Sequence, residues 1–319
     1  LLRLARHPRL RAIWMLTGTP MKNGRPSQLY PLLAAMDHPI ARDQRQFEER
    51  YCQGHWREGR SGKRWQASGA SQLEELRRLT RPLILHRRKQ QVVDLPPKQR
   101  RLYPVELSEA ELTGFDHRVE LVLDDYRRRV QLGEVRRDAE HLALLTSMRQ
   151  IAAEFKLPAA QQLVESLRRQ GEAVVLFSGF VAPLQLLQQT LGGELLTGRQ
   201  RPAERQESVD RFQQGQNDCL LATFGTGALG FTLHRARHVV LLERPWTPGD
   251  LDQAEDRCHR LGMGDGLTCH WLQLGAADQL VDGLLASKAE RIEVLLGPRR
   301  LSLQRQSLPA MVRDCLQLL

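Results

Sequence analysis

Two arginines and a glutamine in the last quarter of the chain have side chains suited to binding phosphate. Gln253, Arg257 and Arg260 lie within the run Asp250–Gly262, whose pattern predicts a helix. Residues three or four positions apart share one helix face, so one surface is expected to carry an amide and two guanidiniums. A guanidinium is planar, permanently charged and forked, which matches phosphate oxygens. A solvated, charged surface helix is the alternative reading of Arg-x-x-Arg alone.

A short apolar run near the beginning of the chain leads into a polar turn. Residues 12–16 predict a buried strand, and residues 17–20 (Thr-Gly-Thr-Pro) follow it directly. In open α/β sheets, ligands gather beyond the carboxyl ends of the strands. The two hydroxyls and the glycine are therefore candidates for sensing a bound phosphate, although the tetrapeptide by itself favours an ordinary strand-to-helix turn.

From residue 156 the chain alternates between strand-like and helical patterns. This alternation predicts a parallel sheet with helices on both faces, the doubly wound α/β class. The helical stretches end near Gly171, Leu191 and Gln214. The expected strands cover residues 173–177, 195–196, 219–222, 239–242 and 267–274.

Two loops follow strands of this expected sheet and bring further polar groups to its edge. Residues 223–230 contain three glycines and two threonines, which allow the backbone to approach a phosphate closely. Residues 243–249 hold Trp246 between two prolines. An isolated tryptophan is more often part of a core, but the polar, proline-stiffened surroundings favour an exposed ring. Each loop alone is a weak signal.

The segment of residues 43–70 lacks a clear periodicity and is interpreted as a surface insertion. Trp56 and Trp65 stand there among basic residues such as Arg57 and Arg64. Basic side chains interleaved with aromatic ones can grip a nucleic-acid backbone. A mobile solvated loop is an equally good interpretation.

The region between the two candidate phosphate sites predicts strands at residues 82–85 and 102–107, joined by a basic, proline-stiffened connector. Ser108 and Glu111 have the spacing of a capping box, so two helices are expected from residue 109 to residue 155. Residues 276–296 predict an amphipathic helix near the end of the chain.

Composition narrows the classes of protein that the chain can belong to. The 319 residues have a formal charge of +10, which favours a polyanionic partner. The five cysteines are odd in number and contain no Cys-x-x-Cys, so neither a disulfide framework nor a metal site is expected. No apolar run is long enough to span a bilayer and no leader pattern is present. The sequence therefore predicts a soluble, intracellular protein with no membrane partner, nuclear in a eukaryote and in the cytoplasm or nucleoid of a bacterium.

The motifs in this order resemble the SWI/SNF-type ATPases of the superfamily-two helicases. The resemblance is carried by the Thr-Gly-Thr-Pro turn, the connector His86–Lys98, the strand ending at Ser178 and the loop of residues 223–233. Its most specific part is the run Gln253–Gly262, with Gln-Ala-x-Asp-Arg-x-His-Arg-x-Gly. Thr232 departs from the family pattern, which often has Asn there. The resemblance implies RecA-like lobes that bind ATP and Mg²⁺ and move along double-stranded DNA without separating its strands.

The family's residue roles can be carried to matching positions of this chain. Arg257 and Arg260 match arginines that reach the ATP phosphates across the cleft between two lobes, the arginine-finger role. The other residues that the resemblance assigns to the ATP cleft are Gln253, Gly230, Thr17, Gly18 and Thr19. Those that it assigns to the DNA path are Ser178, Thr223, Thr226, Gly227 and Trp246.

Two expected motifs are absent from the 319 residues. There is no Gly-x-x-x-x-Gly-Lys-Ser/Thr loop and no Asp-Glu-x-His run, which would hold the phosphates and the Mg²⁺ ion. The chain is therefore expected to be the carboxyl-terminal part of the motor, with a partner in the missing amino-terminal lobe. The expected parts are the end of a first RecA-like lobe at 1–107, a helical insertion at 108–155, a complete second lobe at 156–275, and a brace helix with a tail at 276–319.

A second hypothesis of a different class fits the same absences. A chain that works as it stands, without the phosphate loop, is expected to be a non-catalytic DNA-binding module that relies on its positive charge. As part of a longer protein, it is expected to contribute to a DNA-dependent ATP hydrolase.

Overall fold

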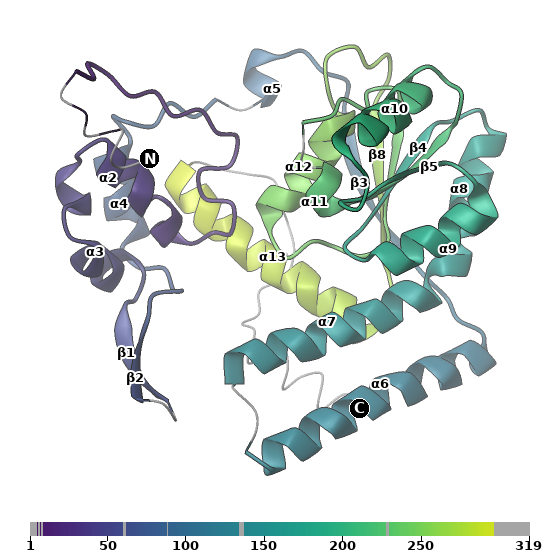
Figure 1. The fold of residues 1–319 in the computed structure, drawn as a ribbon, viewed down its shortest axis with the longest axis horizontal. Coiled ribbons are helices and arrows are strands. Elements are labelled where there is room, and N and C mark those ends of the chain that lie inside the picture. The colour runs from purple at the N-terminus through teal and green to yellow at the C-terminus, as the bar shows by residue number, and fades with distance from the viewer. Residues whose placement is uncertain are drawn as a thin grey trace. The chain divides into compact units, whose positions relative to one another are not determined.

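The computed structural model describes residues 5, 7, 9–59, 62–87, 89–133, 137–227 and 230–296. These residues form two compact units (Figure 1). Described residues of Leu1–Arg88, Thr247–Gly249 and Leu285–Leu303 make up the first unit. Described residues of Lys89–Trp246 and Asp250–Leu284 make up the second. Among the described residues, no helix combines the length and the apolar character that crossing a membrane requires.

The second unit is built on a parallel sheet whose six described strands run in the order β3-β8-β7-β4-β6-β5 (Figure 1). In the central pairings, Val174 lies opposite both Cys219 and His238. The strands are β3 (Lys98–Pro104), β4 (Val174–Ser178), β5 (Glu194–Leu196), β6 (Cys219–Thr223), β7 (His238–Leu241) and β8 (Leu267–Gln273). The expected α/β class with a parallel sheet is confirmed.

The sequence of the central strand explains its position in the sheet. All five residues of β4 are buried, as required of a parallel strand that is covered on both faces. Parallel neighbours need crossover connections, and the chain supplies them as helices between the strands. These helices are α8 (Leu157–Arg169), α9 (Val181–Leu191), α10 (Pro202–Gln213), the short α11 (Phe224–Gly227) and α12 (Pro248–Cys258).

A pair of long helices follows β3 in the second unit. Helix α6 (Glu109–Gln131) begins at Ser108, whose hydroxyl and backbone form the expected capping box with Glu111. Helix α7 (Arg137–Phe155) packs against it around Leu123 and Leu145. Ala277 and Leu280, from the first turns of α13 (Gly275–Leu296), complete this core.

The first unit is a small helical assembly with one hairpin. Its core contains Met21, Leu33 and Phe47, together with Ile292 and Leu295 from the last turns of α13. Its helices are η1 (Pro26–Gln28), α2 (Tyr30–Ala35), η2 (Pro39–Ala41), α3 (Gln44–Tyr51) and α4 (Leu73–Thr80), and the hairpin is β1 (His55–Gly59) with β2 (Gly62–Gln66). The helix expected at 276–296 is present as α13, whereas its role as a brace stays a prediction.

Two strands expected from short apolar runs are absent. Residues 12–16 are irregular, with Trp14 and Leu16 87% and 94% exposed, and residues 82–85 form a turn and coil. A buried strand needs hydrogen-bonding neighbours, and the described part of the first unit offers these runs no parallel sheet to join. The prediction of a strand was therefore wrong in both places.

The expected boundary at residue 107 is also revised by the pairing of β3. This strand, placed with the first lobe from sequence, is hydrogen-bonded along its length to β8, with Lys98 opposite Leu267. The change of unit falls earlier, between Arg88 and Lys89. A short α5 (Lys89–Val92) precedes the strand.

Candidate functional site: the arginine-bearing end of helix α12

The two candidate arginines lie at the end of α12, but they do not share one helix. Arg257 is in the last helical turn, the helix ends at Cys258, and Arg260 lies in the bend that follows. The sequence predicted a helix continuing to Gly262, so this detail was wrong. Gln253 lies one turn before Arg257 on the same helix, and all three side chains are partly buried rather than fully solvated.

Acidic residues fix the opposite side of α12 to the sheet. Glu255 is fully buried and lies 3.0 Å from Lys98 and 2.7 Å from Arg100 of β3. Arg100 also binds Asp252 at 3.0 Å. Burial alone would raise the pKa of the Glu255 carboxyl, but Lys98 and Arg100 outweigh it and lower that pKa to about 2. Glu255 is therefore ionised at neutral pH and anchors the helix at a defined rotation.

The connector before β3 holds the end of α12 from another direction. The Lys89 ammonium donates to the carbonyl of His259 and lies 3.4 Å from Asp256. The His259 ring nitrogen Nε2 is 2.8 Å from the carbonyl of Pro96. Lys89 therefore binds the backbone directly after the last residue of α12 and before Arg260. The sequence indicated only a basic, proline-stiffened connector here, and its contacts with the end of α12 were not predicted.

The bend at Arg260 is tied to the loop after α11. Nη1 of Arg260 donates to the Thr232 hydroxyl at 2.7 Å, and the amide of Leu233 donates to the carbonyl of Arg257 at 2.8 Å. Burial and the nearby charge of Arg260 lower the pKa of Arg257. Two neighbouring guanidiniums that repel one another provide a position where an anion would be stabilised by both.

The glycine-rich loop is only partly the open phosphate cradle that was expected. Thr223 ends β6, and its hydroxyl lies 2.8 Å from that of Thr226, which is buried. Gly227 closes the short helix α11. Gly230 is exposed with a φ of +93°, and a Cβ added there would meet nothing within 4 Å, so space for a ligand remains beside its backbone.

The structure does not support a direct DNA contact by Ser178. Its side chain is fully buried, and its hydroxyl donates to Glu243 at 3.0 Å. The amide of Gly179 donates to the same carboxylate. The buried hydroxyl therefore fixes the carboxyl end of β4 against the end of β7 instead of facing solvent.

Trp246 is also less exposed than its proline-flanked loop suggested. Its ring packs against the core between α6 and α7, with the Arg149 guanidinium 4.3 Å from the ring centroid. Arg149 is itself buried and donates to the carbonyl of Arg244. The loop after β7 is thus held in place by a helix far away in sequence, a relation that no local sequence pattern could reveal.

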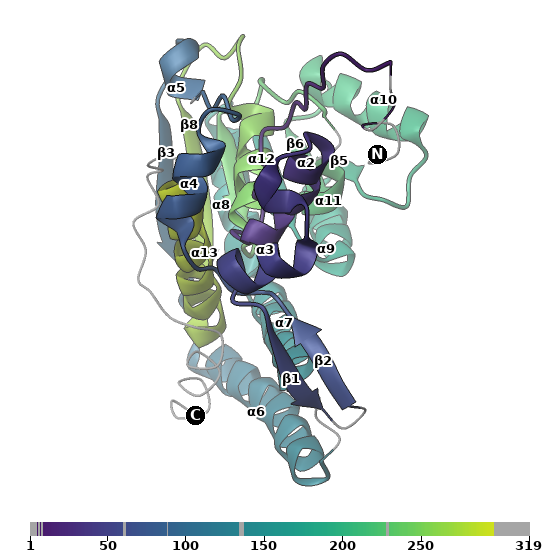
Figure 2. The same ribbon diagram turned by 90° about the vertical axis from the view of Figure 1, so that its left-hand side faces the viewer.

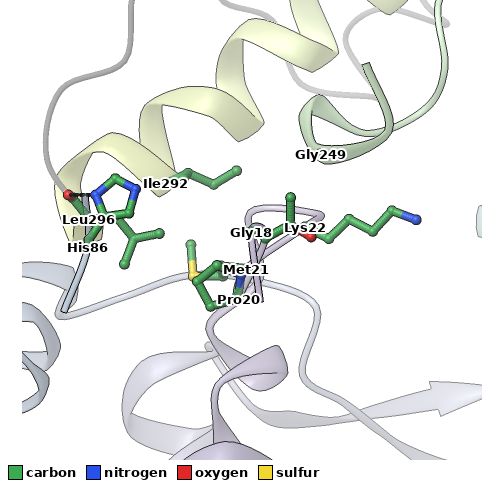
Figure 3. Close-up of a pocket in the computed structure, with 9 residues that line it drawn as sticks. Gly18, Pro20, Met21, Lys22, His86, Gly249, Ile292 and Leu296 are labelled. Carbon is green, nitrogen blue, oxygen red and sulfur yellow. Dashed lines mark hydrogen bonds between the residues drawn. The ribbon is translucent and has the colours of Figure 1, made fainter. Parts of the chain in front are cut away.

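The Thr-Gly-Thr-Pro turn lies in the first unit and borders a small pocket (Figure 3). The amide of Thr19 donates to the Thr17 hydroxyl at 3.1 Å, and Gly18 is exposed. The amide of Gly249 donates to the carbonyl of Lys22 at 3.2 Å, and a Cβ on Gly249 would lie 2.6 Å from a Lys22 side-chain carbon. The pocket is lined by residues 18–22, His86, Gly249, Ile292 and Leu296. Gly18 and Thr19 therefore lie beside Gly249 within the first unit.

The described residues offer no group of three or more His, Cys, Asp or Glu side chains arranged to hold a metal ion. Cys52, Cys219, Cys258 and Cys269 are free and buried. Burial raises the pKa of the Cys219 thiol to about 12, so this thiol stays neutral and packs as an apolar group. The fifth cysteine, Cys315, lies outside the described residues.

Comparisons with known proteins agree with the motif order. Residues 3–157 match the SNF2-related domain, and residues 156–262 match the helicase conserved C-terminal domain. The chain is 29% identical over 307 residues to the DNA annealing helicase and endonuclease ZRANB3 of Bos taurus, covering 92% of this chain and 28% of that protein. It is 31% identical over 296 residues to the SWI/SNF-related matrix-associated actin-dependent regulator of chromatin subfamily A-like protein 1 of Xenopus tropicalis, covering 89% of this chain and 30% of that protein.

Among solved structures, the Sulfolobus solfataricus SWI2/SNF2 ATPase core in complex with dsDNA is similar with a TM-score of 0.48 and 22% identity, covering 86% of this chain and 60% of that one. The chain spans less than a third of the length of the two curated relatives, so it corresponds to one part of such proteins. The two domain matches overlap at residues 156–157 and together reach from residue 3 to residue 262. The chain belongs to the SWI/SNF-type ATPase family of the superfamily-two helicases.

Proposed function

We propose that this chain is the arginine-finger part of a DNA-dependent ATPase that moves along duplex DNA. The observation that carries the proposal is the pair Arg257 and Arg260, held at the end of α12 by ion pairs on one side and by Thr232 on the other. Family membership supplies the reaction class, and two relatives are named as proteins of DNA annealing and chromatin regulation. The complete protein would be the enzyme.

The residues present suit an ATP phosphate. Arg257 and Arg260 would neutralise the negative charge that spreads over the transferred phosphoryl oxygens. Gln253, one turn earlier, would add a neutral hydrogen-bonding group beside them. Because Glu255 and Asp252 are already committed to Lys98 and Arg100, these carboxylates would not compete with the phosphate for the two guanidiniums.

Bound ATP with Mg²⁺ would supply the phosphoryl group that is transferred. Negative charge would develop on the oxygens of this group during the transfer. The phosphate loop and the acidic residues that would hold ATP and Mg²⁺ are absent from the 319 residues. We propose that another part of the motor contributes this loop and these acidic residues. Thr17, Gly18 and Thr19 would report nucleotide state to the segment around Gly249, which lies beside them in the first unit.

The DNA path would follow the loop after β6. Thr223, Gly227 and Gly230 would place backbone amides near a DNA phosphate, because the glycines permit close approach. Buried Thr226 would shape this loop through its hydrogen bond to Thr223. Trp246 would border the same path with the part of its ring that Arg149 leaves accessible.

Translocation without strand separation can be measured by displacement of a third strand from a DNA triplex. The complete protein is expected to release the third strand when ATP is present while leaving the underlying duplex paired. Movement along the duplex pushes the third strand off, whereas static binding does not. Release that is equally fast without ATP would contradict the proposal, and so would separation of the duplex itself.

A further inference from the structure

Arg149 is a buried cation whose contacts differ from those of two other buried cations in the second unit. It lies on α7, which runs beside α6 (Figures 1 and 2). Lys156 pairs with Asp278 at 2.7 Å, and Arg244 pairs with Asp282 at 2.9 Å. Within the described part of the chain, no ion pair joins Arg149 to a carboxylate, and its buried Nε has no hydrogen-bond partner. A guanidinium is costly to bury without compensation, so other contacts must hold it.

One backbone carbonyl and two aromatic rings surround this guanidinium. Arg149 donates to the carbonyl of Arg244, and its guanidinium carbon lies 4.3 Å from the ring centroid of Trp246 and 5.7 Å from that of Phe180. The attraction between a cation and an aromatic ring grows when both are removed from water. The buried guanidinium therefore restrains the orientation of the Trp246 ring.

The two rings belong to loops that follow neighbouring strands. Phe180 follows β4 and Trp246 follows β7. These strands are paired in parallel, so their carboxyl ends meet at one edge of the sheet. Glu243 joins the two loops, since its carboxylate accepts from the Ser178 hydroxyl and from the Gly179 amide. The guanidinium from α7 thus contacts both loops at this edge.

A purely structural role accounts less well for this arrangement. Burial lowers the pKa of Arg149, and the nearby Glu243 carboxylate opposes this shift. Apolar residues of similar volume can often replace buried charges without loss of stability. A methionine would fill much of the same space with no charge to desolvate. It would lack the hydrogen bond to the Arg244 carbonyl and the cation–π contact with Trp246, which orient the loop.

We propose that Arg149 is a positioning residue for the contact with duplex DNA. Its side chain holds Trp246 and the loop after β7 in the orientation that meets the DNA. This inference rests on the proposed function, which assigns Trp246 to the DNA path, and it adds a residue of the α6–α7 helix pair on which that contact depends. Arg149 is buried and acts through Trp246. Its loss is therefore expected to weaken the response to duplex DNA and to spare the hydrolysis step.

The test compares ATP hydrolysis by the complete protein over a range of duplex concentrations. Arg149→Met is expected to raise the duplex concentration at half-maximal hydrolysis about tenfold, the effect of losing one desolvated cation–π contact. The rate at saturating duplex is expected to stay within about twofold of the unmodified rate, because the variant loses binding that the ground and transition states share. Circular dichroism checks that each variant is folded.

The matched control is Arg118→Met. Arg118 is exposed on α6, and its guanidinium carbon lies 5.8 Å from the ring centroid of Phe155. The control therefore removes one arginine and one cation–π contact from the same pair of helices. Neither residue belongs to the loops after β4 and β7, so the half-saturating duplex concentration and the saturating rate are both expected to stay unchanged.

A double variant shows whether Arg149 acts through Trp246. Trp246→Ala alone is expected to raise the half-saturating duplex concentration by a factor similar to that of Arg149→Met. Adding Arg149→Met to Trp246→Ala is expected to cause no further rise, because the effects of residues that act through one contact are not additive. A residue needed only for the fold would add its own effect to that of Trp246→Ala.

A second substitution covers the case in which Arg149→Met does not fold. Arg149→Lys then takes its place with the same expected rise. Lysine keeps the buried charge, but its ammonium lacks the planar, forked shape that stacks on a ring while donating to a carbonyl. Failure of both variants to fold would show that the residue serves the core, and it would overturn the inference.

Three further outcomes would overturn the inference and leave the proposed ATPase function standing. The first is a half-saturating duplex concentration for the Arg149 variant equal to that of Arg118→Met. The second is a lower rate at saturating duplex with an unchanged half-saturating concentration. The third is an additive effect in the double variant. Hydrolysis by the unmodified protein that does not respond to duplex DNA would instead contradict the proposed function, and this inference with it.

Discussion

Replacement of Arg260 by alanine is expected to lower DNA-stimulated ATP hydrolysis by the complete protein at least about a thousandfold, the usual contribution of an arginine finger. The guanidinium is already positioned by its hydrogen bond to Thr232 at 2.7 Å. It therefore needs little reorganisation when charge develops on the phosphoryl group, and alanine removes the whole of this preorganised stabilisation.

Two further variants separate catalysis from folding at this site. Thr232→Ala keeps the guanidinium and removes one hydrogen bond to it, so the rate is expected to fall only about tenfold. Arg169→Ala removes an exposed arginine from α8 in the same unit and should leave the rate unchanged. The rate of phosphate release at saturating ATP and duplex DNA measures hydrolysis by each of the three variants. A rate for Arg260→Ala close to that of Arg169→Ala would rule out the finger role.

Replacement of Lys156 by methionine is expected to lower the free energy of unfolding by about 3–5 kcal/mol, because it leaves a buried carboxylate without its charge partner. Lys156 and Asp278 are 0% and 1% exposed, and their charged atoms lie 2.7 Å apart. Asp278 also accepts the amide of Leu274 at 2.8 Å, which fixes the beginning of α13. Burial lowers the pKa of Lys156, and Asp278 opposes that shift.

The paired variant Lys156→Met, Asp278→Asn distinguishes a lost charge partner from lost packing. Asparagine is neutral and can still accept the Leu274 amide, so most of the lost stability is expected to return. Urea denaturation followed by circular dichroism measures each change. Arg128→Ala, which disrupts an exposed pair with Asp125, is the control and should cost less than about 1 kcal/mol. A Lys156→Met effect as small as this control would show that the buried pair contributes little.

Local sequence patterns were sufficient to predict most helices and strands of the second unit. Capping by Ser108 with Glu111 was correctly predicted, as were the strands around residues 174–178 and 219–223, because each signal is contained in adjacent residues. The runs at residues 12–16 and 82–85 failed for the opposite reason. An apolar run becomes a strand only where neighbouring strands can bond to it.

The helix that carries the candidate residues could be predicted from the sequence, but the contacts around it could not. The run Gln253–Gly262 correctly indicated a helix there, whereas the contact of Lys89 with the backbone just beyond its end at Cys258 joins residues 170 positions apart. Ser178 and Trp246 were expected at a surface and are held inward by Glu243 and Arg149. These contacts join distant segments, so no local motif contains them.

The hairpin shows a third kind of gap between sequence and structure. The sequence contained all its basic and aromatic residues, but both a DNA-gripping surface and a solvated loop were compatible with them. The register pairs Trp56 with Trp65 on one face of the hairpin and Arg57 with Arg64 on the other, with Glu58 and Lys63 on the tryptophan face. The register of the two strands, which the sequence alone did not specify, decides which of these side chains are neighbours.

The rate of ATP hydrolysis by the complete protein, measured with and without duplex DNA, tests the central claim most directly. If the chain supplies arginine fingers to a motor that moves along duplex DNA, the rate of hydrolysis is expected to rise with duplex concentration until the rate saturates. A rate of hydrolysis that does not change when duplex DNA is added would contradict the claim. So would salt-dependent duplex binding with no hydrolysis at all, which is the behaviour expected of a non-catalytic DNA-binding module.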